Sequence, residues 1–246
     1  SLAVVGNVVL NASGTGTVTL GNLSPAGHLD ITTSNGNVTL GASSIGGQLL
    51  VSSNNGSLSQ TGALTVNGTT DIHIGGDVLL NNAGNHWVGG VQINARSLDL
   101  SSAGNLSITG LTLAANQALS LQAQGNLNLG ASVNLDTGNA DLTLASGGSF
   151  SVLGALSGAN ISLTADTGLS LGHDITASGS LVLTTHTGGV TQTGGRLSVA
   201  GTTTVSAGNS AILLGQSTNH FGDDVMLVGA DSSLVGNSAI TLGASS

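Results

Sequence analysis

The chain has 246 residues and a formal net charge of −9, and only 5% of its residues are charged, where an average globular domain has roughly a quarter. Its two basic residues are arginines, which offer too little positive charge for nucleic acid as a partner. The lack of cysteine excludes disulfides and thiolate chemistry. No apolar run approaches the roughly 18 residues of a membrane-spanning helix, so membrane insertion is not expected.

From residue 6 onward the chain consists of short apolar alternations separated by glycine or asparagine. Examples are GNVVLN from Gly6, GTVTLG from Gly16, GHLDIT from Gly27 and GNVTLG from Gly36. Apolar residues two positions apart predict strands with one buried and one solvent-exposed face. Helical spacing is not sustained anywhere, so the sequence predicts an all-β protein.

Larger blocks also recur along the chain. Similar superblocks start near residues 29, 98 and 161, and a fragment of a fourth starts near 232. Their spacing equals about three turns of roughly 20 residues each, a length typical of solenoid repeats. The pattern predicts a right-handed parallel β-helix of about 12 coils of roughly 20 residues. We expect residues 1–246 to form one continuous β-helix that is a fragment of a longer protein.

Glycines occur at matching places in these superblocks, notably Gly36, Gly104 and Gly168. We expect glycine and asparagine to occupy the corners of the coils, where the backbone needs a positive φ angle. Small outward serines and threonines suit stacked strands, because like charges directly opposite one another repel. These three glycines are therefore predicted to be structural residues of the repeat.

A second kind of repeat links two distant parts of the chain. The segment 47–74 contains SQTGALTVNGTT, and the segment 179–207 contains TQTGGRLSVAGTT. About a dozen residues further on, NHWVGGVQI begins at Asn85 and NHFGDDVML at Asn219. The two asparagines are therefore predicted to have a shared structural role in the repeat.

The residues that follow these asparagines are equivalent as well: His86 with His220, and Trp87 with Phe221. The simplest interpretation is that each aromatic ring plugs the coil. The alternative is that the four side chains contact a ligand, with the rings stacking on a sugar of a carbohydrate or exopolysaccharide.

These blocks, together with the units GNLSIT and GNLNLG, resemble filamentous haemagglutinin repeats over nearly the whole chain. Such repeats form the stalk of large adhesins exported by two-partner secretion in Gram-negative bacteria. The resemblance implies a right-handed parallel β-helix in a secreted, surface-exposed virulence protein that serves cell adhesion, aggregation or biofilm. It also implies a host-cell surface or matrix polysaccharide or protein as partner, and an outer-membrane transporter. The Asn-Pro-Asn motif of the secretion domain is absent, so that domain is expected outside this fragment.

Catalytic and metal-binding patterns are weak. The aspartates are scattered, and Asp223 and Asp224 are adjacent, so they would point to opposite faces of a strand. The six histidines lack the spacing of a zinc site, and the glycine- and aspartate-rich calcium nonapeptide is absent. We expect no catalytic residue, metal or cofactor. A β-helical polysaccharide lyase or hydrolase is a third alternative, and ice-binding Thr-x-Thr rows occur only locally, at 15–19 and 202–204.

Overall fold

A computed structural model describes residues 2–131 and 133–244. No helix occurs within these ranges, so none of their segments could cross a membrane as a helix. The strands pair in parallel and stack as a β-solenoid of about 11 turns of about 21 residues. The predicted parallel β-helix is confirmed, with slightly fewer and longer turns than expected; its right-handed sense stays a prediction.

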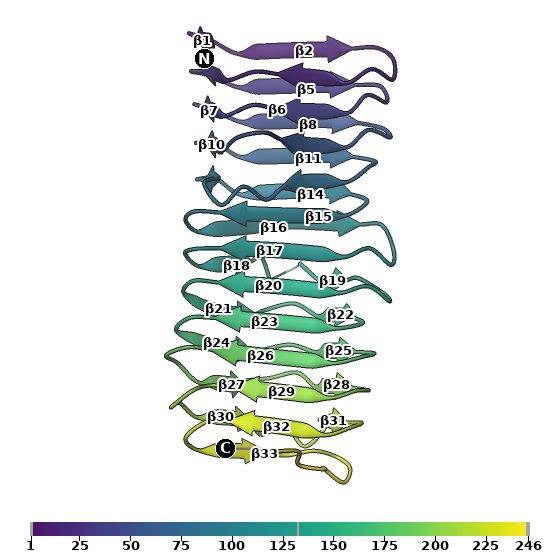
Figure 1. Cartoon of the computed structure of the whole chain (residues 1–246), viewed down its shortest axis with the longest axis vertical. Helices are drawn as coiled ribbons and strands as arrows, with labels where there is room; N and C mark the ends of the chain where they lie inside the picture. Colours follow the sequence, from purple (N-terminus) through teal and green to yellow (C-terminus); the bar gives the residue numbers. More distant parts are fainter. Residues whose placement is uncertain (1, 132, 245–246) are drawn as a thin grey trace. The chain divides into compact units, whose positions relative to one another are not determined.

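The chain divides into two compact units. The first comprises Ser1–Ala114 and Ser120–Gly125, and the second comprises Ala115–Leu119 and Asn126–Ser246. The continuity of the β-helix over residues 1–246 stays a prediction. Within both units the chain visits three sheets in the same order: a broad sheet, which has the longer strands of that unit, then a second sheet and a third sheet (Figure 1).

In the first unit the three sheets are built from the following strands. The broad sheet contains β2 (Val8–Ala12), β5 (Leu29–Thr33), β8 (Leu49–Ser53), β11 (Thr70–Ile74), β14 (Val91–Ala95) and β16 (Leu106–Leu113). The second sheet contains β3 (Val18–Leu20), β6 (Val38–Leu40), β9 (Leu58–Gln60), β12 (Val78–Leu80), β15 (Leu98–Ser102) and β17 (Leu119–Ala123). On the third side, β1 (Leu2–Val4) pairs with β4 (Leu23–Pro25), and the third sheet contains β7 (Ser43–Ile45), β10 (Leu64–Val66) and β13 (His86–Trp87).

The second unit has the same plan. Its broad sheet contains β20 (Leu142–Ser146), β23 (Ile161–Ala165), β26 (Leu181–Thr185), β29 (Thr203–Ser206) and β32 (Val225–Val228). Its second sheet contains β18 (Leu127–Leu129), β21 (Ser149–Val152), β24 (Gly168–Leu171), β27 (Val190–Gln192), β30 (Ile212–Leu214) and β33 (Ser232–Leu234). Its third sheet contains β19 (Leu135–Asp136), β22 (Leu156–Gly158), β25 (Ile175–Ala177), β28 (Leu197–Val199) and β31 (His220–Phe221).

Buried aliphatic side chains form ladders inside each unit, because inward residues of paired strands lie directly over one another. In the first unit Ile31 pairs with Val51, and Val51 pairs with Ile72. In the second unit Leu144 pairs with Leu163. All five side chains are fully buried. Full burial of such a side chain stabilises the fold by roughly 1.5–3 kcal/mol, so the repeated Val, Leu and Ile positions supply the core.

The outward rows keep like charges apart. On the broad sheet of the first unit, Asp30 pairs with Leu50, and Leu50 pairs with Asp71. The two carboxylates are therefore separated by an uncharged residue on an intervening strand. Because strands lie about 4.8 Å apart, this alternation avoids the repulsion of directly opposed charges.

Corner side chains tie each coil to the next. The Oδ1 atom of Asn7 accepts the His28 N–H at 2.9 Å, and His28 Nδ1 accepts the Gln48 N–H at 2.8 Å. In the second unit Asn160 Oδ1 accepts the Ser180 N–H at 3.0 Å. Buried or corner N–H groups need such partners, which explains why Asn or His so often follows the corner glycine.

The expected reason for the glycines is wrong at most positions. Among the described residues, positive φ angles occur only at Asn116 and at the glycines Gly14, Gly138, Gly168, Gly195 and Gly208. At Gly36, by contrast, a Cβ atom would overlap the carbonyl oxygen of Gly16 in the coil before. The close approach of stacked coils, more than the backbone conformation, therefore requires glycine at these corners.

Candidate functional site

A pair of side-chain amides, one half-buried and one fully buried, joins two coils in the first unit. Gln60 ends β9, and Asn85 directly precedes β13. Gln60 Nε2 donates to Asn85 Oδ1 at 2.8 Å, and Asn85 Nδ2 donates back to Gln60 Oε1 at 2.9 Å. Asn85 also accepts the Leu64 N–H at 2.9 Å and donates to the Leu80 carbonyl oxygen at 2.8 Å. Asn85 is fully buried, and its amide makes the four hydrogen bonds that an amide can make. We call this pair the first amide clasp.

The second unit contains the same arrangement, the second amide clasp. Gln192 Nε2 donates to Asn219 Oδ1 at 2.8 Å, and Asn219 Nδ2 donates to Gln192 Oε1 at 2.8 Å. Asn219 accepts the Leu197 N–H at 2.9 Å and donates to the Val235 carbonyl oxygen at 3.2 Å. Both clasps therefore connect the glutamine of the QTG segment with the asparagine of the Asn-His-aromatic segment.

The aromatic rings beside the clasps lie inside the core. Trp87 is 3% exposed and Phe221 is 4% exposed. The indole N–H of Trp87 donates to the Ser101 carbonyl oxygen at 2.9 Å, which is the partner that a buried indole needs. Neither ring presents a face on which a sugar could stack.

The neighbouring histidines are exposed, and each covers a turn of the following coil. A Cβ atom on Gly104 would come within 2.9 Å of the His86 ring. His220 Nδ1 lies 3.3 Å from the Ser238 hydroxyl. The structure thus brings together Asn85, His86 and Trp87 in one unit and their equivalents in the other, around buried polar contacts and not around an open cleft.

The other glycines singled out in the sequence have separate surroundings. Gly36 accepts hydrogen bonds at its carbonyl oxygen from the hydroxyls of Thr33, at 2.8 Å, and Ser53, at 3.1 Å. Gly168 has a φ angle of 153°, a conformation that favours glycine. Within its own unit, Gly36 lies between β5 and β6, and Gly168 begins β24 directly after β23.

Histidine and aspartate side chains meet in two pairs within the described ranges. His73 Nε2 lies 3.0 Å from Asp71 Oδ1, and His186 Nδ1 lies 2.7 Å from Asp166 Oδ1. Asp223 accepts the backbone N–H of Asp224 at 2.8 Å. In the part of the chain that the structure describes, no three His or Asp side chains form a group that could hold a metal ion.

Asp77 has the strongest charged contacts. Both of its oxygens accept hydrogen bonds from the Arg96 guanidinium, and the Ser97 hydroxyl donates to Oδ1 at 2.6 Å. The hydrogen bonds from Arg96, followed by that from Ser97, hold the pKa of Asp77 below its ordinary value. A lowered folded-state pKa means that this carboxylate stabilises the fold above its unfolded pKa of about 3.9 and stops doing so as the pH falls.

We therefore expect Arg96→Met to lower the melting temperature at neutral pH, with a deficit that shrinks as the pH falls from about 4 to about 2. Added salt should also reduce the deficit, because the pair is partly exposed. Thermal melts of the parent and variant across this range provide the measurement. A deficit that stays constant with pH would assign the effect to packing of the arginine stem.

Two equivalent threonines carry buried hydroxyls for which the described residues provide no partner: Thr70 and Thr203, in the two GTT segments. Both side chains are buried in aliphatic ladders, where Thr70 pairs with Leu49 and Val91. A buried hydroxyl without a hydrogen bond costs about 1–3 kcal/mol. These hydroxyls therefore oppose folding.

Thr70→Val and Thr203→Val should each raise the free energy of unfolding by about 1 kcal/mol, since valine keeps the shape and removes the hydroxyl. Thr33→Val is the matched control, because Thr33 is also buried but donates to Gly36; it should be neutral or destabilising. Urea denaturation followed by circular dichroism measures all three. Equal effects at the three positions would contradict the assignment.

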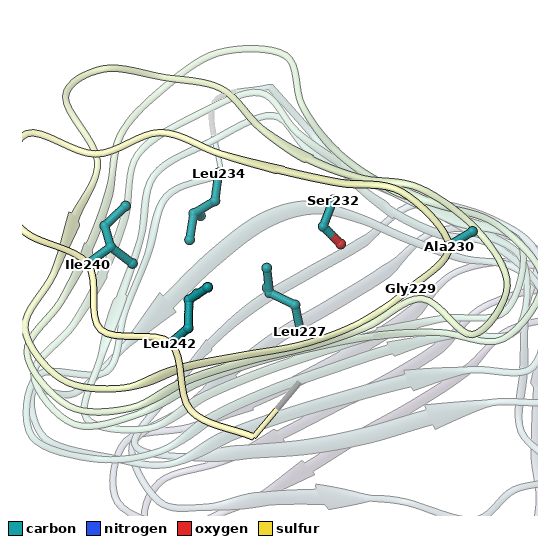
Figure 2. Close-up of a pocket in the computed structure, with 7 residues that line it drawn as sticks. All are labelled: Leu227, Gly229, Ala230, Ser232, Leu234, Ile240 and Leu242. Carbon is teal, nitrogen blue, oxygen red and sulfur yellow. The ribbon is translucent and has the colours of Figure 1, made fainter. Parts of the chain in front are cut away.

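An apolar hollow of about 530 Å³ opens at one end of the second unit. It is lined by Leu227, Gly229, Ala230, Ser232, Leu234, Ile240 and Leu242. Figure 2 shows Leu227, Leu234, Ile240 and Leu242 pointing into the space enclosed by this coil. The hollow is the interior of the stack seen end-on, and apart from Ser232 its lining side chains are apolar.

The sequence did not point to Gln60 and Gln192 as partners of the asparagines. Their signal was present, because both QTG segments precede an Asn-His-aromatic segment. The separation hides the contact: Gln60 and Asn85 are 25 residues apart, and Gln192 and Asn219 are 27 apart. Both separations exceed one coil of about 21 residues.

No curated protein and no solved structure matches the chain. A family model described as repeats of unknown function (DUF5649) matches residues 26–94 and 158–228. Each matched segment contains one complete amide clasp and the aromatic residue beside it. The chain therefore belongs to the family of repeats of unknown function (DUF5649).

Proposed function

We propose that the chain is part of the structural stalk of a secreted bacterial surface adhesin. The observation that carries this proposal is the coil-on-coil stacking within each unit, in which the edges of one coil are hydrogen-bonded by the next. Such an arrangement gains length by adding repeats, and each repeat contacts mainly its neighbours. The resemblance to filamentous haemagglutinin repeats supports the adhesive context.

In this proposal the parent protein is exported across the outer membrane of a Gram-negative bacterium by a dedicated transporter that recognises a secretion domain elsewhere in the protein. The stalk then presents a separate binding region to a host-cell surface or to matrix polysaccharide or protein, for attachment, aggregation or biofilm formation. The small uncharged outward side chains suit this spacer role, because stacked like charges would repel.

Direct carbohydrate binding by this chain has less support. The hypothesis depended on the ring of Trp87 or Phe221 stacking on a sugar, and both rings are buried. His86 and His220 remain exposed, but each lies over a turn of its own unit. We therefore assign ligand contact to another region of the parent protein.

Single-molecule stretching of the chain, held at its two ends, tests the mechanical part of the proposal. A coil of about 21 residues should release roughly 65 Å of chain when it unravels, because an extended residue spans about 3.4 Å and the coil contributes only about 4.8 Å while stacked. We expect length increments in multiples of this value at forces well above those of a relaxed chain. Extension without resolvable force peaks would contradict a stalk that resists mechanical force.

The same chain, added to a glycan array and to immobilised matrix polysaccharides, tests where the ligand binds. The stalk proposal expects retention no greater than that of an unrelated β-solenoid of similar charge. Specific retention that is unchanged in Trp87→Phe and lost in His86→Ala would instead place a binding site on this chain.

A further inference from the structure

Both Asn-His-aromatic segments occupy the same place in the fold: they form the last strand of a third sheet. In the first unit the third sheet runs β7, β10, β13, and β13 is His86–Trp87. In the second unit it runs from β19 to β31, and β31 is His220–Phe221. The third side of the first unit also carries β1 and β4 before these strands, and in both units the shared sequence forms the last strand on that side.

The coil that follows is short in both units. Along the broad sheet, Thr70 pairs with Val91 after 91 − 70 = 21 residues, but Val91 pairs with Ile108 after only 108 − 91 = 17. A bulge after Val91 then lengthens this step by one residue. In the second unit Thr203 pairs with Val225 after 225 − 203 = 22 residues, whereas Val225 pairs with Leu242 after 242 − 225 = 17.

The shortening occurs at the third sheet. The Ala103 N–H donates to the Asn85 carbonyl oxygen at 2.6 Å, and the Asn237 N–H donates to the Asn219 carbonyl oxygen at 2.8 Å. From these contacts the chain returns to the broad sheet in five residues in each unit (108 − 103 and 242 − 237). It therefore passes the third side without adding a strand that pairs with β13 or β31.

The asparagine holds the coils on both sides of this junction. Between two third-sheet strands, the first N–H of one strand can donate to a backbone carbonyl of the next coil. The Ser43 N–H, for example, donates to the Ala63 carbonyl oxygen at 3.1 Å. Leu64 donates instead to the side-chain oxygen of Asn85. The Asn85 side chain thus takes the place of a backbone acceptor for Leu64 in the preceding coil. The Asn85 backbone carbonyl accepts the Ala103 N–H of the following coil.

The aromatic ring and the histidine complete the junction. The two preceding strands of the third sheet place Ile45 and Val66 at the register position of Trp87. The following coil has no third-sheet strand, so a smaller side chain at this position would leave a cavity. A tryptophan or phenylalanine fills that volume, which matters because cavities in a close-packed core are destabilising. The histidine then covers the turn of the short coil, at Gly104 or Ser238.

We propose that the amide clasp and the Asn-His-aromatic segment together act as a terminator of the third sheet. The segment fixes the length of each three-sheeted section and redirects the chain into a two-sheeted coil. Each match to the family model contains one such terminator. The repeat of this family is therefore a section of the solenoid with its own built-in end, and this inference is independent of the proposed adhesive context.

Hydrogen exchange, measured by mass spectrometry on the full chain, tests the role of the aromatic ring. In Trp87→Ala two amides should exchange at least about ten-fold faster, while β5 is unchanged: that of Val88, which donates to Val66 in the coil before, and that of Ala103, which donates to Asn85 across the junction. Trp87→Phe, which installs the residue used by the second unit, should stay close to the parent. Trp87→Leu serves if the alanine variant does not fold.

Tryptophan fluorescence tests the role of the clasp, because Trp87 is the only tryptophan. Asn85→Ala should shift the Trp87 emission to longer wavelength at a denaturant concentration below the transition seen by circular dichroism. Asn219→Ala, the matched change at the second clasp, should leave the emission in native buffer unaltered. Coincident fluorescence and circular dichroism transitions in Asn85→Ala, or uniform acceleration of exchange in all strands of Trp87→Ala, would overturn the proposal.

Discussion

Asn219→Leu is expected to lower the free energy of unfolding by about 4 kcal/mol, the largest effect of any single polar substitution in the second unit. The substitution leaves the buried Leu197 N–H without its partner and removes one hydrogen bond from each amide group of Gln192, whose Nε2 still donates to the Gly195 carbonyl oxygen. A buried unsatisfied group costs about 1–3 kcal/mol, and each further hydrogen bond that is lost costs about 1 kcal/mol. Guanidinium denaturation followed by circular dichroism gives the value.

The double variant Gln192→Leu/Asn219→Leu is the matched control. It removes both amides of the clasp, so the groups that lose a partner are the backbone groups bonded to the amides, among them the Leu197 N–H. We expect it to be more stable than Asn219→Leu alone, with a coupling energy of about 2 kcal/mol in the double-mutant cycle. Additive effects would show that the two amides do not depend on one another.

Gly188→Ala should destabilise the second unit by about 3 kcal/mol, because overpacking at a rigid contact typically costs about 1–3 kcal/mol or more. A Cβ atom on Gly188 would overlap the backbone carbonyl of Thr167 and come within 2.8 Å of the Gly168 Cα atom. No flexible side chain is available to move aside, so the stacked corners must separate.

Gly215→Ala provides the control for this substitution. Gly215 lies in the same unit, and no atom lies within 4 Å of the point that its Cβ would occupy. Alanine there should be neutral or stabilising by up to about 1 kcal/mol, because it restricts the unfolded chain. Thermal melts of the two variants compare them directly, and a similar loss in both would mean that conformational entropy, not coil contact, governs these corners.

The fold was predictable because its main determinants are local. Apolar residues two positions apart define each strand, and their recurrence about every 20 residues defines the ladder, as in Ile31, Val51 and Ile72. The recurrence also identified Asn85 and Asn219 as equivalent positions. Neither inference requires knowledge of contacts beyond the next coil.

The surroundings of the site residues were harder to predict. A tryptophan in a loop-like segment is compatible with either a sugar platform or a core plug, and only the pairing of Val66 with Trp87 turns the ring inward. The partner of Asn85 was hidden because Asn85 lies one residue before His86, which pairs with Thr65, whereas Gln60 lies across the preceding corner at the end of β9; the contact therefore spans a corner as well as one coil. The sequence predicted where the corner glycines lie but not why glycine is needed there. The reason is the short distance between successive coils, which a single sequence does not reveal.

The regular step between paired strands has a consequence for how the molecule is assembled. Almost every strand finds its neighbour about one coil away along the chain, as β8 does in pairing with β5 and β11. Loop closure over so few residues carries a small and nearly constant entropic penalty. A chain delivered one end first can thus be zipped up progressively, each new segment templated by the one laid down before it.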